Sequence, residues 1–115
     1  MHQRALSRRE RALGPQHPNV AWSLSSLAAL YREQGRYAEA EPAAVRSLAI
    51  RERVLGPDHN HVANSLHNLG LLRRDQGRFA EARPLLERCL AIREAALEND
   101  HPDTVAVRTA LEELA

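Results

Sequence analysis

Lysine is absent from the sequence, cysteine occurs once, and aromatic residues make up only 3% of the chain. All 16 basic residues are therefore arginine, which together with the many alanines indicates a GC-rich bacterial genome. With one thiol no intrachain disulfide can form, and Cys89 is expected to be a small packed residue. Few aromatic or β-branched residues beside abundant alanine and leucine favour an all-α fold.

Long hydrophobic runs are also missing. No apolar stretch approaches the length of a membrane span or of a secretory signal. The sequence therefore predicts a soluble, cytoplasmic protein with no membrane contact.

No charge of one sign dominates the chain, whose net charge is +1. Binding to nucleic acid usually needs a stripe of uncompensated basic residues, so nucleic acid is not expected as a partner. The mixed pairs Arg51-Glu52 and Arg93-Glu94 are typical of a solvated helix face. A local basic cluster near the N-terminus fits either an exposed terminal helix or an anionic docking patch, and consists of Arg4, Arg8, Arg9 and Arg11.

The chain contains two copies of one 42-residue unit, residues 14–55 and 56–97, which are identical at 24 of 42 aligned positions. Residues 1–13 align with the end of a unit, and residues 98–115 begin another. A helical unit this short cannot bury its apolar face alone, so it must stack on its neighbours. A single repeat array over residues 1–115 is predicted.

Proline and glycine punctuate each unit. Pro18 and Pro102 suit the first turn of a helix, where their missing N–H is not needed. Gly35 and Gly77 are expected to end helices as left-handed C-terminal caps. Helices are predicted over residues 3–13, 19–34 and 37–55, over the counterparts of the last two one unit later, and over 103–114, with Pro42 and Pro84 able to kink two of them.

Apolar residues follow the helical period and define one buried stripe per unit. Small residues at facing positions let neighbouring helices approach closely. The stripes are Leu24, Leu27, Ala28 and Tyr31 in the first unit and Leu66, Leu69, Gly70 and Leu72 in the second, with Ala40 and Ala82 on the following helices.

These positions, in this order, resemble a tetratricopeptide repeat. The period of 42 rather than about 34 residues, and the linker Leu55-Gly56-Pro57-Asp58-His59, resemble the repeats of kinesin light chain and its bacterial relatives. The resemblance implies a tetratricopeptide-type α-solenoid of about six antiparallel helices, forming a segment of a right-handed superhelix.

The family further implies a concave surface, lined by the first helix of each unit, that captures an extended peptide. In kinesin-light-chain-like repeats, asparagines of an Asn-x-Leu-x-Asn-Leu pattern grip the peptide backbone, and residues 64–69 match that pattern. The first unit departs from it at residues 22–27, and the third at 106–111. The resemblance therefore offers one asparagine pair, Asn64 and Asn68.

Helix geometry gathers candidate residues opposite the apolar stripe. Arg32 and Arg74 could hold carboxylates of an acidic peptide, or pair with Glu33, Asp75 and neighbouring helices. Trp22 could anchor a ligand in the groove or pack at the first helix pair. The predicted peptide-binding residues are Trp22, Ser26, Arg32, Asn64, His67, Asn68, Leu71 and Arg74.

No residue pattern indicates catalysis or a cofactor. His17, His59 and His101 recur once per unit, so they cannot converge on one metal ion. The segment Asp58-His59-Asn60-His61 either binds a metal or caps the following helix.

The leading expectation is a non-catalytic scaffold that binds a protein or peptide, with an acidic peptide as one candidate. Arg108 and Glu112 stand where full units have apolar or small residues, which predicts a polar capping helix at the C-terminal end. The alternatives are a structural segment of a larger signalling protein that self-associates through its end helices, and a metal-binding enzyme fragment around Asp58, His59 and His61.

Overall fold

The computed structural model describes residues 18–96 and 101–114. The predicted helix over residues 3–13, the N-terminal arginine cluster and His17 lie outside these residues. The described residues contain five α-helices: α2 (Pro18–Glu33), α3 (Tyr37–Leu55), α4 (Asn60–Asp75), α5 (Phe79–Ala96) and α6 (Pro102–Glu113).

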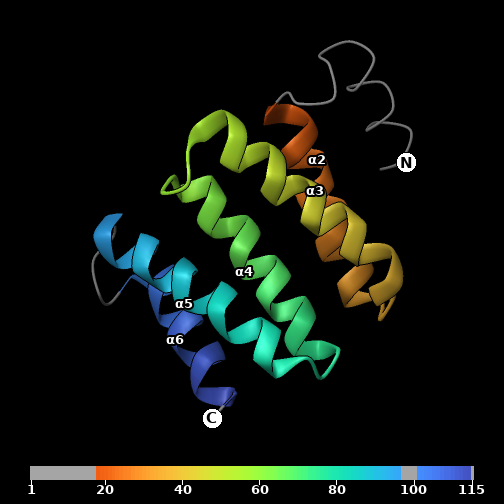
Figure 1. Cartoon of the computed structure of the whole chain (residues 1–115). Coiled ribbons are helices and arrows are strands. Elements are labelled where there is room, and N and C mark those ends of the chain that lie inside the picture. Colours follow the sequence, from red (N-terminus) through yellow and green to blue (C-terminus); the bar gives the residue numbers. More distant parts are fainter. Residues whose placement is uncertain (1–17, 97–100, 115) are drawn as a thin grey trace.

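The helices stack in chain order, as Figure 1 shows. Helix α2 packs on α3, α3 on α4, α4 on α5, and α5 on α6, while α2 also touches α4. Each helix runs antiparallel to the next because the connecting turns are short. The predicted all-α solenoid is confirmed. Within the described part of the chain, no helix combines the length and apolar character that crossing a bilayer requires.

Glycine ends the first helix of each unit as predicted. Gly35 and Gly77 have φ angles of 74° and 77°, in the left-handed region. In the second unit the N–H of Arg78 bonds the carbonyl of Arg73 at 2.8 Å, and the N–H of Gly77 bonds that of Arg74 at 2.9 Å. This pair of bonds is the Schellman arrangement, which satisfies carbonyls at the helix end.

Gly77 gives a direct test of this cap. A Cβ at residue 77 would meet no atom within 4 Å, so the cost of a substitution there is expected to come mainly from the backbone angle. We expect Gly77→Val to lower the free energy of unfolding by about 1–2 kcal/mol, and Gly77→Asn to cost less. Urea unfolding measures both variants, and equal losses would contradict the left-handed cap.

Histidine starts the first helix of the later units. His59 is the N-cap of α4, and its Nδ1 accepts a bond from the N–H of His61 at 3.0 Å. His101 caps α6 in the same way, accepting from Asp103 at 3.1 Å. Pro42 and Pro84 lie at the sixth position of α3 and α5, and both helices continue through them.

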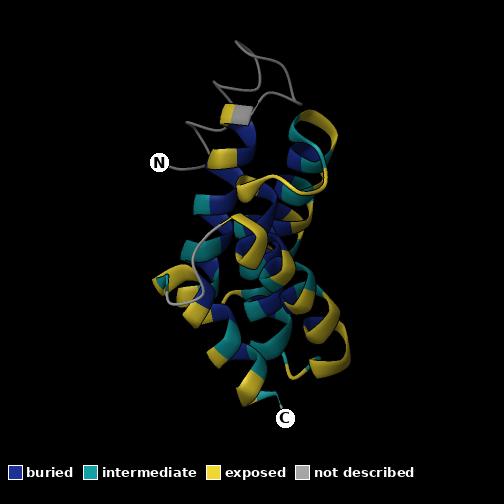
Figure 2. Cartoon of the chain, turned by 90° about the vertical axis from the view of Figure 1, so that its left-hand side faces the viewer, coloured by how far each residue is buried: buried dark blue, intermediate teal, exposed yellow. Residues whose placement is uncertain are grey.

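The core runs along the contacts between helices, where Figure 2 shows the buried residues. The predicted apolar stripes are buried, and Ala40, Ala82 and Cys89 have no exposed surface. Gly70 is the tightest point, because a Cβ there would lie 2.6 Å from Cδ2 of Leu86. Helices α4 and α5 therefore meet with no space for a side chain at this position.

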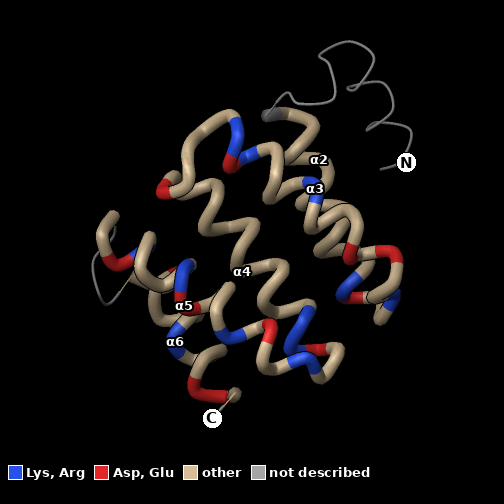
Figure 3. The backbone as a smooth tube through the Cα atoms, in the orientation of Figure 1, with Lys and Arg blue, Asp and Glu red and all other residues tan. Residues whose placement is uncertain are grey.

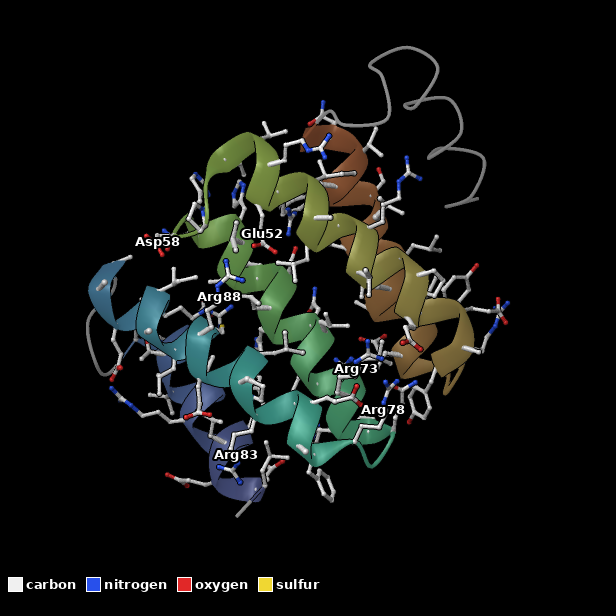
Figure 4. The ribbon with its side chains drawn as sticks, viewed as in Figure 1. Glu52, Asp58, Arg73, Arg78, Arg83 and Arg88 are labelled. Atoms are coloured by element: carbon white, nitrogen blue, oxygen red, sulfur yellow. The ribbon has the colours of Figure 1, made fainter. Side chains whose placement is uncertain are left out.

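Charged residues of both signs are interspersed over the surface, and the middle of α4 carries none (Figure 3). Ion pairs join α3 to α4 and to α5 on the face seen in Figure 4. There Arg88 of α5 bonds Glu52 of α3 at 3.1 Å, and Arg73 of α4 bonds Glu41 of α3 at 2.5 Å.

Candidate functional site

A cavity of about 310 Å³ lies between α2 and α4, with one arginine from α3 and one from α5. We call it the groove. The residues that line it are Trp22, Ser25, Ser26, Ala29, Arg51, Asn64, His67, Asn68 and Arg93. Five of the eight predicted peptide-binding residues are among them, and Arg32, Leu71 and Arg74 are not.

Trp22 is exposed at the groove, with 56% of its surface accessible. Its ring meets the ring of His61 edge-on at 6.4 Å between centroids, and Cζ of Arg51 lies 5.8 Å from the Trp22 centroid. Of the two placements considered from the sequence, the structure has the tryptophan on the groove rather than packed inside the first helix pair.

Arg32 and Arg74 already have carboxylate partners. Nη1 of Arg32 lies 3.2 Å from Oδ2 of Asp75. Arg74 contacts the other oxygen of Asp75 at 3.2 Å, and its Nη1 contacts Glu113 of α6 at 2.7 Å. The alternative in which these arginines pair with Asp75 and a neighbouring helix therefore describes their contacts. Leu71 packs partly against the second core cluster.

The arginines inside the groove, Arg51 and Arg93, were missed by the sequence pattern. Their alternation with glutamate predicted a solvated helix face, and this was wrong for the arginines, which are only 3% and 5% exposed. The helical spacing was a better signal of burial. Each arginine lies four positions after a buried small residue, Ser47 before Arg51 and Cys89 before Arg93. Residues four apart share a helix face, so the arginine points inward too.

Arg51 joins the first unit to the second. Its Nη1 donates to Ser25 Oγ at 3.1 Å, to Ser65 Oγ at 2.9 Å and to the carbonyl of His61 at 3.1 Å. Ser47 lies between the two serines, 2.7 Å from Ser25 and 3.1 Å from Ser65. This buried network holds the first turn of α4 against α2 and α3. Burial lowers the pKa of the Arg51 guanidinium, although an arginine stays protonated in proteins.

Arg93 repeats the arrangement one unit later. Its Nη1 donates to the carbonyl of Asp103 at 2.9 Å, and its Nη2 donates to Oδ1 of Asn64 at 3.0 Å. The same Nη1 lies 3.2 Å from Nδ1 of His67. Because a guanidinium has no acceptor, the histidine nitrogen must accept.

His67 is held neutral in this setting. Burial, followed by the charge of Arg93 and then that of Arg32, lowers the pKa of His67 to about 4. The imidazole therefore contributes no positive charge at neutral pH. The groove's charge comes from Arg51 and Arg93, and no carboxylate among the described residues lines it or pairs with either arginine.

Neither a reactive thiol nor a metal cluster is found in the described ranges. Cys89 is buried, its Sγ donates to the carbonyl of Ala63 at 3.2 Å, and burial raises the pKa of its thiol to about 11. Ser47 makes the equivalent bond to Ala21 at 3.0 Å, so Cys89 is the small packed residue that was predicted. No three histidine, cysteine or acidic residues of residues 18–96 and 101–114 gather as metal ligands would.

Comparison with solved structures gives relatives of the same fold. A kinesin-light-chain-like protein of Podosopora anserina with nearly identical TPR-like repeats superposes with a TM-score of 0.91 at 26% identity, over 98% of this chain and 54% of that one. BtubC (BKLC) of P. vanneervenii superposes with a TM-score of 0.89 at 23% identity, over 98% and 45%. The chain thus spans about half the length of these relatives. No curated protein matches its sequence.

A family model supplies the assignment. The tetratricopeptide repeat model matches residues 1–53, 27–95 and 62–115, which together cover the whole chain. Two solved structures of the Podosopora anserina protein, both at 26% identity, carry kinesin-light-chain TPR-like repeats. The chain belongs to the tetratricopeptide repeat family, and its repeats are of the kinesin-light-chain-like kind.

Proposed function

We propose that the groove binds an extended peptide of a partner protein. Tetratricopeptide repeats commonly mediate protein–protein interaction and are generally non-catalytic. The observation that carries the proposal is the groove itself: an exposed Trp22 lies beside polar groups that the fold leaves unused. The side chains of Ser26 and Asn68 line it and make no hydrogen bond to the described residues.

Each element of the groove has a separate task in this proposal. Trp22 supplies apolar contact area of the kind that dominates binding energies. Asn68 can bond both the N–H and the carbonyl of an extended backbone, because an amide carries donors and an acceptor. Arg32, Leu71 and Arg74 extend this surface along α2 and α4, where acidic groups of a peptide would compete with Asp75 and Glu113 for the arginines.

The proposal is tested by selecting binders from a library of random 12-residue peptides. We expect Asn68→Ala to weaken a selected peptide by about 1–3 kcal/mol, because it removes backbone bonds, and to leave the melting temperature nearly unchanged. Titration calorimetry and thermal melts measure the two effects.

Asn60→Ala is the matched control, since Asn60 is an exposed asparagine of the same helix outside the groove. Equal losses of peptide affinity in the two variants would contradict a specific role of Asn68 in binding. A lowered melting temperature in Asn68→Ala with unchanged peptide affinity would show that Asn68 stabilises the fold instead. The rival hypothesis is that the chain self-associates through its end helices and binds no peptide. Sedimentation at several protein concentrations tests it, because self-association without peptide binding would support the rival and contradict the groove.

A further inference from the structure

Histidine caps the first helix of the later units, in a position where serine, threonine, asparagine and aspartate are the usual residues. His59 is the N-cap of α4 and His101 is the N-cap of α6. In both helices Nδ1 of the ring accepts the N–H of the second helical residue, from His61 at 3.0 Å and from Asp103 at 3.1 Å. The same bond at the same place in two units makes the histidine cap a feature of the repeat.

The capped residue is also the residue that receives the arginine joining two units. The carbonyl of His61 accepts from Nη1 of Arg51 at 3.1 Å, and the carbonyl of Asp103 accepts from Nη1 of Arg93 at 2.9 Å. One residue in the first turn is thus held on both sides. Its N–H is bonded to the cap of its own helix, and its carbonyl is bonded to the helix before.

This cap depends on the protonation of an imidazole. The neutral ring has one acceptor nitrogen, whereas the protonated ring has two donors and no acceptor. Histidine is the side chain that ordinarily takes up a proton between about pH 5 and pH 8. A protonated His59 could not accept the N–H of His61, and its charge would stand at the positive end of the α4 dipole. Both effects act against the first turn of α4 as the pH falls.

The groups that face His59 do not offset such a charge. The rings of His59 and His61 lie 4.8 Å apart between centroids. Burial, followed by the charge of Arg51 and then that of His59, lowers the pKa of His61. From α2 the neighbour is the uncharged ring of Trp22, which meets His61 edge-on. The surroundings of this cap are therefore neutral or positive.

The linker before α4 and helix α5 add no anion to this cap. Arg88 of α5 donates to the carbonyl of Pro57 at 3.1 Å. Asp58 makes no hydrogen bond or ion pair within the described part of the chain. The cap of α6 differs, because Oδ2 of Asp103 lies 4.0 Å from Nδ1 of His101. A proton on His101 gains a carboxylate where it loses the bond, so the two caps share their hydrogen bond and differ in their charged neighbours.

From these contacts we infer that the joint between α3 and α4 is a proton-sensitive hinge. His59 holds the first turn of α4 at neutral pH and releases it in mildly acidic solution, whereas the joint between α5 and α6 stays closed. Release of His61 also loosens its bond from Arg51 and its contact with Trp22. Since α4 forms one wall of the groove, the hinge links the shape of the groove to pH. The inference does not depend on what the groove binds.

Amide hydrogen exchange of the whole 115-residue chain tests the hinge, followed by nuclear magnetic resonance at about pH 7 and about pH 5.5. Ala63 and Val105 report on the two joints, because their N–H groups bond the carbonyls of His59 and His101 at 3.1 and 3.0 Å. After correction for the intrinsic pH dependence of exchange, we expect the protection of Ala63 to fall about three- to tenfold on acidification, as for the loss of a helix cap. The protection of Val105 should change by less than about twofold. Equal falls at both amides would indicate a general effect of acid and would overturn the hinge.

His59→Asn is the decisive variant, because asparagine is a preferred N-cap and does not titrate. We expect the protection of Ala63 in this variant to be the same at both pH values within about twofold. His59→Ala, which removes the acceptor, should show at neutral pH the low protection that the wild type shows in acid. His101→Asn is the matched control and should leave the acid response of Ala63 as in the wild type. An undiminished acid response in His59→Asn, or none in the wild type, would refute the hinge.

Discussion

Replacing Gly70 by leucine is expected to lower the free energy of unfolding by about 3 kcal/mol, at the upper end of what overpacking a core costs. A Cβ at residue 70 would lie 2.6 Å from Cδ2 and 2.7 Å from Cγ of Leu86, whose side chain is fully buried among other core residues. Helices α4 and α5 would have to separate. Urea unfolding followed by circular dichroism gives the loss, and a neutral result would mean that the two helices are not paired at this position.

The first unit contains a natural control for this contact. Gly70 and Leu86 align with Ala28 and Ala44 of the first unit. The second unit therefore has a glycine facing a leucine where the first unit has two alanines. We expect Leu86→Ala alone to cost about 2–5 kcal/mol through the cavity it leaves. Adding Gly70→Ala to it should then recover part of that loss. A coupling energy of about 1 kcal/mol or more between the two substitutions would establish the contact, whereas strictly additive losses would argue against it.

The fold could be predicted from the sequence because its determinants are local. Gly35 and Gly77 end helices through their own backbone angles, and His59 and His101 cap helices through a bond to a residue two positions later. Because the units repeat, the helix pairing of one unit predicts that of the next. Ala28 and Gly70 occupy the same position and mark the point where the two helices of each unit approach closely. These signals need no knowledge of distant contacts.

The candidate site was predicted only in part because its contacts are long-range. Asn64, Asn68 and Trp22 could be placed on a common face by helix periodicity, and they do line the groove. The partner of Arg74 on α6, Glu113, lies 39 positions away, and Arg51 meets Ser25 26 positions away. A short alternation of charges says nothing about such partners, so Arg51 and Arg93 were assigned to the solvent.

Buried polar groups also distinguish the two units. Arg51 bonds two serines, whereas Arg93 bonds His67 and Asn64, which align with Ser25 and Trp22. The shared element is the bond to a main-chain carbonyl in the first turn of the next helix, from His61 in one case and Asp103 in the other. The arginine therefore joins units in both places, while the groove residues around it vary.

Acidification should destabilise the fold through His67. Its pKa in the folded state is about 4, against an ordinary value of 6.5 for histidine, so the unfolded chain binds the proton more readily. The stability associated with the neutral imidazole is complete above pH 6.5 and is lost progressively as the pH falls towards 4. Allowing for the partial exposure of the ring, we expect a loss of about 1–2 kcal/mol between pH 7 and pH 5.

His67→Ser isolates this effect, because serine occupies the aligned position 25 and does not titrate. Carboxylates held by arginines contribute little over the same interval. Glu41 is an example: the bond from Arg73 lowers its pKa, so Glu41 stays ionised at pH 5. The unfolding free energy of His67→Ser should therefore vary less between pH 7 and pH 5 than that of the wild type, by about the 1–2 kcal/mol assigned to the imidazole. Parallel pH profiles for the two proteins would show that His67 keeps an ordinary pKa, and hence that Arg93 and burial do not act on it as the structure indicates.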